Sequence, residues 1–251
     1  MADKIDYKLV GDDMQAVVVA LDPGETVQAE AGAMMFMESD IEMNTEMQGG
    51  VLGGIKRMVG GESFFVVTFI NNGNKKRHVS FAAPYPGKII ALNLAETGPM
   101  LCQRDAYLCS AYGIEISIAF TRRLGAGFFG GEGFILQKLS GDGYAFIHAG
   151  GTVLTQELGV GEYLLVDTGC LVALEETVKY DIKMASGIKT ALFGGEGLFR
   201  AELTGPGKVY LQTLPFSRMA DRVISAAGFG SKGEVKRGGV GGVLGGFLNG
   251  D

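Results

Sequence analysis

Alternation of apolar and polar residues predicts that most of the chain forms β-strands. In GIEISIAF (113–120) the isoleucines and the phenylalanine fall on one face of an extended strand, and Glu115 and Ser117 fall on the other. Three further pairs of β-type runs flank NNGN, SGDG and TGPG, which are compositions typical of tight turns, so hairpins are expected there. Helical spacing is found at SRMADRVISAAGF (217–229). We therefore expect an all-β fold with a short C-terminal helix.

A recurring Gly-Gly-Glu word divides the chain into three similar units. It occurs in MVGGESF (58–64), FFGGEGF (128–134) and LFGGEGL (192–198), and in each unit β-type runs precede and follow it, which predicts about four strands per unit. Because one such unit would leave its apolar face uncovered, the units are expected to pack against each other. The predicted architecture is a single compact domain over residues 1–222, with a pseudo-threefold arrangement of repeats at about 1–90, 91–155 and 156–222, followed by the end of the helix and a flexible Gly-rich tail over 223–251.

Composition and charge exclude several classes of protein. The 41 glycines indicate many turns, and the 47% hydrophobic content excludes a disordered chain. The net charge of −6 disfavours nucleic acid as a partner. The 3 cysteines lack CxxC spacing, which argues against both a disulfide framework and a zinc site. With neither a signal peptide nor a membrane-spanning apolar run, a cytoplasmic protein is expected, at most peripheral to the inner face of the membrane.

The sequence gives little support for catalysis. The two histidines, His78 and His148, have no nearby cysteine or paired carboxylate, and the alignment of His148 with Gln212 indicates a tolerated surface or edge position. GAGFFG (125–130) matches GxGxxG, but a predicted strand follows it where dinucleotide binding requires a helix. We therefore predict no enzymatic activity, no cofactor and no metal.

The glycine-rich segments around the repeated word hold the candidate functional residues. The glutamates Glu62, Glu132 and Glu196 are expected to accept hydrogen bonds from the amides of a tight corner, or alternatively to converge on a cation. Basic and bulky apolar residues precede them, and together these would form an apolar patch ringed by positive charge, suited to a subunit interface, an anionic membrane surface or a membrane protein. These candidate contact residues are Lys56, Arg57, Met58, Arg122, Arg123, Phe128, Phe129, Lys189, Leu192 and Phe193.

Several long motifs occur together in an order that resembles a known family. They are AEAGAMMFM, CQRDAYLCS, FFGGEGFILQKLSGDG, LLVDTGCLVA and LFGGEGLF. From about Asp22 to Pro215 the chain resembles bacterial members of the family named altered inheritance of mitochondria, number twenty-four. The resemblance implies a β-rich fold similar to that of the tryptophan RNA-binding attenuator protein, duplicated within the chain, and a tendency to self-associate. For the mitochondrial members it implies a part in inner-membrane organisation, and it implies no catalytic residues.

The leading hypothesis from these observations is a non-enzymatic homo-oligomeric β-scaffold, a trimer or larger, which acts through protein or membrane-surface contacts at the Gly-rich basic and apolar loops. The alternative is a small-ligand receptor or an enzyme with a pocket between repeats, which a polar cavity holding acidic residues would favour. Nucleic-acid binding by analogy of fold ranks below both.

Overall fold

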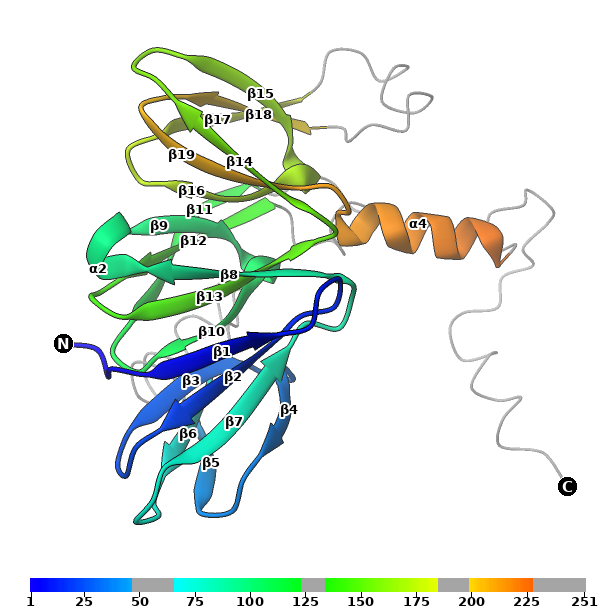
Figure 1. The fold of residues 1–251 in the computed structure, drawn as a ribbon. Helices are drawn as coiled ribbons and strands as arrows, with labels where there is room; N and C mark the ends of the chain where they lie inside the picture. Colours follow the sequence, from blue (N-terminus) through cyan, green and yellow to red (C-terminus); the bar gives the residue numbers. More distant parts are fainter. Residues whose placement is uncertain (47–65, 123–133, 185–198, 228–251) are drawn as a thin grey trace, which may run out of the picture. The chain divides into compact units, whose positions relative to one another are not determined.

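The computed structural model describes residues 1–46, 66–122, 134–184 and 199–227. The described residues are mostly β-strand, with one helix longer than a single turn near the C-terminus, so the predicted all-β class is confirmed (Figure 1). The pseudo-threefold arrangement stays a prediction. The chain divides into two units, residues 1–217 and 218–251, and every described strand belongs to the first unit.

The strands of the first unit form three successive two-layered groups, which we call sandwiches 1, 2 and 3. Sandwich 1 contains β1 (Asp6–Val10), β2 (Ala16–Leu21), β3 (Thr26–Glu30), β4 (Met34–Met37), β5 (Ile41–Glu46), β6 (Val66–Asn71) and β7 (Arg77–Ala82). Sandwich 2 contains β8 (Gly87–Asn93), β9 (Met100–Gln103), β10 (Tyr107–Ala111), β11 (Glu115–Arg122), β12 (Phe134–Ser140) and β13 (Tyr144–Gly150). Sandwich 3 contains β14 (Val153–Leu158), β15 (Tyr163–Asp167), β16 (Leu171–Glu175), β17 (Lys179–Met184), β18 (Phe199–Thr204) and β19 (Gly207–Gln212). The helical elements are α2 (Leu94–Thr97), the 3-10 turns η1 (Arg104–Ala106) and η3 (Thr168–Cys170), and α4 (Phe216–Ala226).

The same pattern of strand pairing occurs in each sandwich. Leaving aside β1, which pairs with β2, each sandwich has six strands: the sixth lies between the first and the third, and the fifth lies between the second and the fourth. In sandwich 2, for example, β13 lies between β8 and β10, and β12 lies between β9 and β11. The expected four strands per unit were too few, because short turns such as η1 and η3 divide apolar runs that alternation alone reads as one strand.

The segments NNGN, SGDG and TGPG join two layers of a sandwich, so the predicted hairpins are wrong. Strand β6 pairs with β3 and β5, whereas β7 pairs with β2 and β4. The physical reason is that both strands carry apolar residues that face each other across the sandwich. Phe69 and Phe81 are both buried, and their ring centroids lie 5.2 Å apart. Face-to-face packing buries both rings between the layers.

Two six-stranded sheets run through neighbouring sandwiches and join them. The pairing of β3 with β10 connects sandwich 1 to sandwich 2, and the pairing of β9 with β16 connects sandwich 2 to sandwich 3. We call these two pairings the internal junctions. The first buried apolar cluster extends through sandwiches 1 and 2 to β16, and the second lies mainly in sandwich 3 and reaches into sandwich 2. The sandwiches therefore share sheets and core residues.

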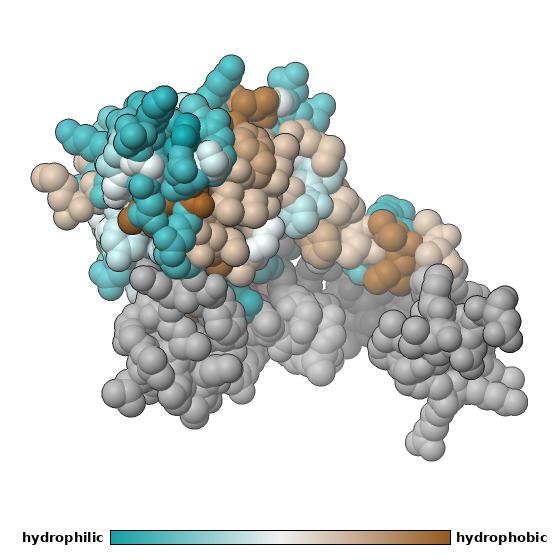
Figure 2. Space-filling view, turned by 90° about the horizontal axis from the view of Figure 1, so that it is seen from below, coloured by the Kyte–Doolittle hydropathy of each residue, from teal (hydrophilic) through white to brown (hydrophobic). Residues whose placement is uncertain are grey.

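Helix α4 begins at Phe216 and ends at Ala226, within one residue of the predicted start. None of its residues is buried, and Val223 and Ile224 are 62% and 50% exposed. Figure 2 shows apolar residues of this helix as a brown cluster. Among the described helices, none combines the length and the apolar character needed to cross a membrane.

Candidate functional site

Most of the residues singled out from the sequence lie outside the described residues. Arg122 is the last residue of β11, where it is paired with Phe134 of β12. The segments that carry the candidate residues connect β5 to β6, β11 to β12 and β17 to β18, which are corresponding strands of the three sandwiches. The residues outside the described part are Glu62, Glu132 and Glu196 together with Lys56, Arg57, Met58, Arg123, Phe128, Phe129, Lys189, Leu192 and Phe193.

A pocket of about 180 Å³ lies between sandwich 1 and sandwich 2. Sandwich 1 contributes the turn between β3 and β4 (30–33) and the end of β7 with the residues after it (82–85). Sandwich 2 contributes Asp105 from η1, two residues of β10, and His148 from β13. Small residues, alanine and glycine, form much of the first wall, and acidic and aromatic side chains border the space that they leave.

The environment of the pocket changes the acidity of two of its groups. Burial, reinforced by the nearby Asp105 carboxylate and opposed by Arg104, raises the pKa of Glu30 to about 7. Burial, with smaller effects of Asp105 and Glu30, raises the pKa of Tyr85 to about 12. Glu30 therefore exchanges its proton near neutral pH, and Tyr85 remains a hydrogen-bond donor.

His148 is 3% exposed and borders the same pocket, so the predicted surface or edge position is wrong. It lies on β13, between β8 and β10, and burial lowers its pKa to about 4. Its ring meets that of Tyr85 edge-on, with centroids 4.5 Å apart. Within the described residues its Nδ1 atom has no hydrogen-bond partner. The ring is therefore neutral at physiological pH.

The corresponding position of sandwich 3 is filled by a side chain whose two polar atoms are both hydrogen-bonded. Gln212 on β19 accepts a hydrogen bond from the amide of Gly150 at 2.7 Å and donates one to the carbonyl of Gly169 at 2.8 Å. Sandwiches 2 and 3 thus differ at this position. In sandwich 3 the glutamine hydrogen-bonds to two backbone groups, whereas in sandwich 2 one ring nitrogen of His148 has no hydrogen bond to any described residue. This contrast marks the pocket as a candidate ligand site.

Two edge strands in different sandwiches are separate candidate contact sites. In the part of the chain that the structure describes, β4 pairs with β7 alone and β15 pairs with β18 alone. The four residues of β4, all large and apolar, are 36–63% exposed, and Tyr163 and Leu165 of β15 are 53% and 48% exposed. Exposed apolar edge strands are templates for pairing with another strand. The sequence signal that marks β4 is the uninterrupted run MMFM, which lacks the alternation of a half-buried strand.

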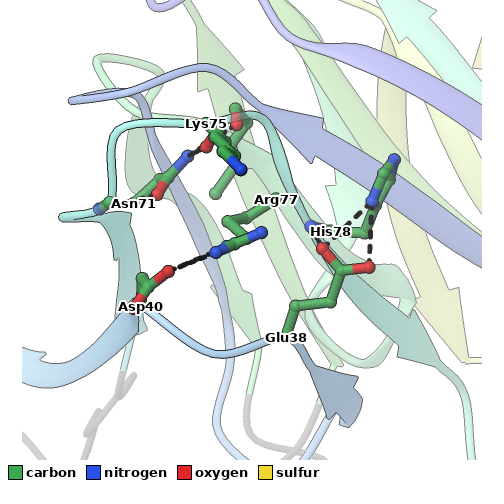
Figure 3. Close-up of polar contacts among 8 residues, drawn as sticks. Glu38, Asp40, Asn71, Lys75, Arg77 and His78 are labelled. Carbon is green, nitrogen blue, oxygen red and sulfur yellow. Dashed lines mark hydrogen bonds and ion pairs between the residues drawn. The ribbon is translucent and has the colours of Figure 1, made fainter.

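Polar contacts hold the end of β4 in place (Figure 3). The backbone amide of His78 donates to Glu38 Oε2 at 2.9 Å, and this bond is the main reason that the pKa of Glu38 is lowered. Arg77 Nε donates to Asp40 Oδ2 at 3.0 Å, and an ion pair reinforces this contact. Asn71 Nδ2 donates to the carbonyl of Lys75 at 2.8 Å and so orders the turn before β7. The edge strand is therefore fixed at its C-terminal end.

Among the described residues, no three His, Cys, Asp or Glu side chains lie close enough together to bind a metal ion. Burial raises the pKa of the Cys102 and Cys109 thiols, that of Cys102 to about 12. Both cysteines are buried and therefore remain protonated thiols at neutral pH.

Comparison with known proteins places these features in a family. The family model described as mitochondrial biogenesis AIM24 matches residues 7–214. An uncharacterized protein of Streptococcus pyogenes serotype M6 is 27% identical over 212 residues, which cover 81% of this chain and 83% of the relative. The crystal structure of a Streptococcus pyogenes protein has a TM-score of 0.74 at 23% identity, and the match covers 89% of this chain and 100% of that one. The latter similarity supports the fold.

The family match extends through all three sandwiches, from β1 to just beyond β19. It confirms the resemblance drawn from the five sequence motifs. Neither the family description nor the relative's name assigns a catalytic activity. The chain belongs to the mitochondrial biogenesis AIM24 family.

Proposed function

We propose that this protein is a non-enzymatic, self-associating β-scaffold, and that its Gly-rich basic and apolar segments make contacts with an anionic membrane surface or with partner proteins. The supporting observation is positional. The segments 47–65, 123–133 and 185–198 each connect the fourth and fifth strands of a sandwich, which are paired with each other in all three cases. Three segments at corresponding positions would bind one partner surface more tightly than one segment, because each further contact is made at a high effective concentration.

Membrane binding is tested by flotation of the full-length protein with vesicles of phosphatidylcholine and phosphatidylserine. Each basic side chain near an anionic surface contributes about 1 kcal/mol, so Arg122→Glu with Arg123→Glu should weaken binding by at least about 30-fold. The matched control is Lys8→Glu with Lys75→Glu, which makes the same charge change at exposed lysines outside these segments. Equal flotation of the two double variants would contradict the proposed membrane contact.

Self-association is tested separately by light scattering. The wild-type protein should have a mass of several chains, and a mass of one chain at micromolar concentration would contradict the scaffold proposal. Phe128→Ser with Phe129→Ser then shows whether the apolar part of the Gly-rich segments contributes to that mass or to vesicle binding alone.

A second candidate function, a small-ligand receptor, is favoured by the pocket between sandwiches 1 and 2. Glu30, Tyr85 and Asp105 offer polar contacts beside an apolar wall, and His148 has an unbonded ring nitrogen. Native mass spectrometry of gently purified protein should then reveal a retained small molecule at one per chain. Glu30→Ala should abolish its retention, and protein of bare chain mass in both forms would contradict this candidate.

A further inference from the structure

We infer that β4 of one copy pairs antiparallel with β15 of a second copy, with Phe36 opposite the partner's Val166, Met37 opposite the partner's Leu165 and Glu38 opposite the partner's Leu164. This inference rests on the proposed self-association and names the contact that produces it. It follows from the way in which the sandwiches of one chain are already joined.

Both internal junctions use corresponding strands and the same register. In each, the second strand of one sandwich pairs antiparallel with the third strand of the next. At the first junction Ala29 of β3 lies opposite Cys109 of β10. At the second, Cys102 of β9 lies opposite Ala173 of β16. Strand β15 is the second strand of sandwich 3, and β4 is the third strand of sandwich 1. Neither strand takes part in these two pairings.

A β-bulge aligns the three third strands residue by residue. The bulge falls between Met34 and Phe36 in β4, between Tyr107 and Cys109 in β10, and between Leu171 and Ala173 in β16. Phe36 therefore corresponds to Cys109 and Ala173, the two residues that make the junction pairs. Bulges fix the register of a strand, so this correspondence is strongly determined.

Spacing along the chain aligns the three second strands. Ala29, Cys102 and Val166 each stand five residues before the first bulge residue of the third strand that follows them. Val166 is consequently the residue of β15 that corresponds to Ala29 and Cys102. The junction register then requires Phe36 to face the partner's Val166.

A hydrogen bond at the end of β4 repeats one found at an internal junction. Glu175, the last residue of β16, accepts a hydrogen bond from the amide of Lys208 at 3.1 Å. Glu38 occupies the corresponding place after β4 and accepts one from the amide of His78 at 2.9 Å. The open edge therefore already has the local structure of a strand in a completed junction.

Burial shows what the open edge lacks. Tyr107, Leu108 and Cys109 of β10 are 1%, 2% and 0% exposed, and the first four residues of β16 are 0–1% exposed. The corresponding residues of β4 are 36–63% exposed. Apolar side chains at the same positions are thus buried wherever a second strand is present. The addition of β15 from a neighbour would bury those of β4 in the same way.

The occupant is a second copy because each chain offers one β4 and one β15 in different sandwiches. Within one chain, β4 and β15 belong to two different sheets. Sandwich 2 lies between sandwich 1, which contains β4, and sandwich 3, which contains β15 (Figure 1). A contact between two different surfaces is heterologous, so further copies add head to tail until a ring closes or a filament grows.

Disulfide trapping tests the register directly. Met37→Cys and Leu165→Cys proteins, carrying different tags and co-expressed, should form a cross-linked dimer on mild oxidation, whereas either variant alone should not. Met37→Cys with Leu164→Cys is the matched control, because neighbouring residues of a strand point to opposite faces and this pair should give at least about 10-fold less dimer. The single variants also control for the native cysteines.

The possible outcomes separate this inference from the scaffold proposal. A multimeric mass without Met37–Leu165 cross-linking would overturn the β4–β15 contact and leave self-association standing. A cross-link that forms within the single chain of a Met37→Cys, Leu165→Cys double variant, with no dimer on co-expression, would also overturn it. A monomeric wild-type protein would reject both.

Charge placed on the edge provides an independent test. Phe36→Lys with Met37→Lys should reduce the mass by light scattering to that of one chain, with an unchanged circular dichroism spectrum. Met43→Lys with Ile118→Lys adds the same charge at exposed apolar positions of β5 and β11 and should keep the wild-type mass. Retention of the full mass by the β4 variant would overturn the inference.

Discussion

Glu30 is expected to destabilise the folded protein at neutral and alkaline pH, and Glu30→Gln should relieve this cost. The folded-state pKa of about 7 lies above the ordinary value of 4.5 because the carboxylate is buried beside Asp105. Between these two values the folded state binds the proton more strongly, so its stability falls as the pH rises from about 4.5 to about 7. At 1.36 kcal/mol per pKa unit the full cost is about 3 kcal/mol above pH 7.

The experiment compares urea unfolding of wild-type and Glu30→Gln proteins at pH 5 and pH 8. Glutamine keeps the shape and a polar end group but carries no charge, so the variant should be more stable by about 3 kcal/mol at pH 8 and by under about 1 kcal/mol at pH 5. A variant that is less stable than wild type at pH 8, or whose advantage is equal at the two pH values, would refute the argument that burial of this charge is unfavourable.

Because burial lowers the pKa of His148, the free energy of unfolding of the wild type should fall by up to about 3 kcal/mol as the pH falls from 6.5 to 4. Urea unfolding of His148→Gln should not show this pH dependence. Gly87→Ala would place a methyl group 2.1 Å from the carbonyl oxygen of Ala149, so a loss of at least about 2 kcal/mol is expected, and wild-type stability would show that the backbone yields there. Tyr107→Phe removes the hydroxyl that donates to the carbonyl of Gln28 at 3.2 Å and lies 3.0 Å from Ser110 Oγ, and it should cost about 1–3 kcal/mol by thermal or urea unfolding; no change would mean that water replaces the hydroxyl.

Local alternation predicted extended strands, but it did not predict the short turns η1 and η3 that divide them. The alternation in GIEISIAF corresponds to β11 and the residues before it, where Ile114 and Ile116 are 1% and 5% exposed. The alternation fails after Ile118, because a bulge shifts the register between it and Phe120, so that Ile116 packs in the first buried cluster and Phe120 packs against the second. A bulge needs no special residue in this strand, so the pattern gives no warning of it.

The partners of the strands could not be predicted in the same way. Alternation shows which residues of β6 and β7 face a core, but it does not show whether the two strands lie side by side or in opposite layers. The residues that line the pocket between repeats could not be named for a related reason, since Glu30 and His148 are far apart in sequence and meet through the pairing of β3, β10 and β13. Long-range strand order determines both features.

The shared sheets also set an order of events during synthesis. Strand β3 leaves the ribosome about 80 residues before β10, the strand that covers its edge. At roughly 5–20 residues per second, sandwich 1 waits for about 4–16 s with that edge open, and sandwich 2 waits in the same way for β16. Strand β15 is made about 130 residues after β4, so in the contact that we propose each emerging chain displays its β4 edge well before its own β15 edge.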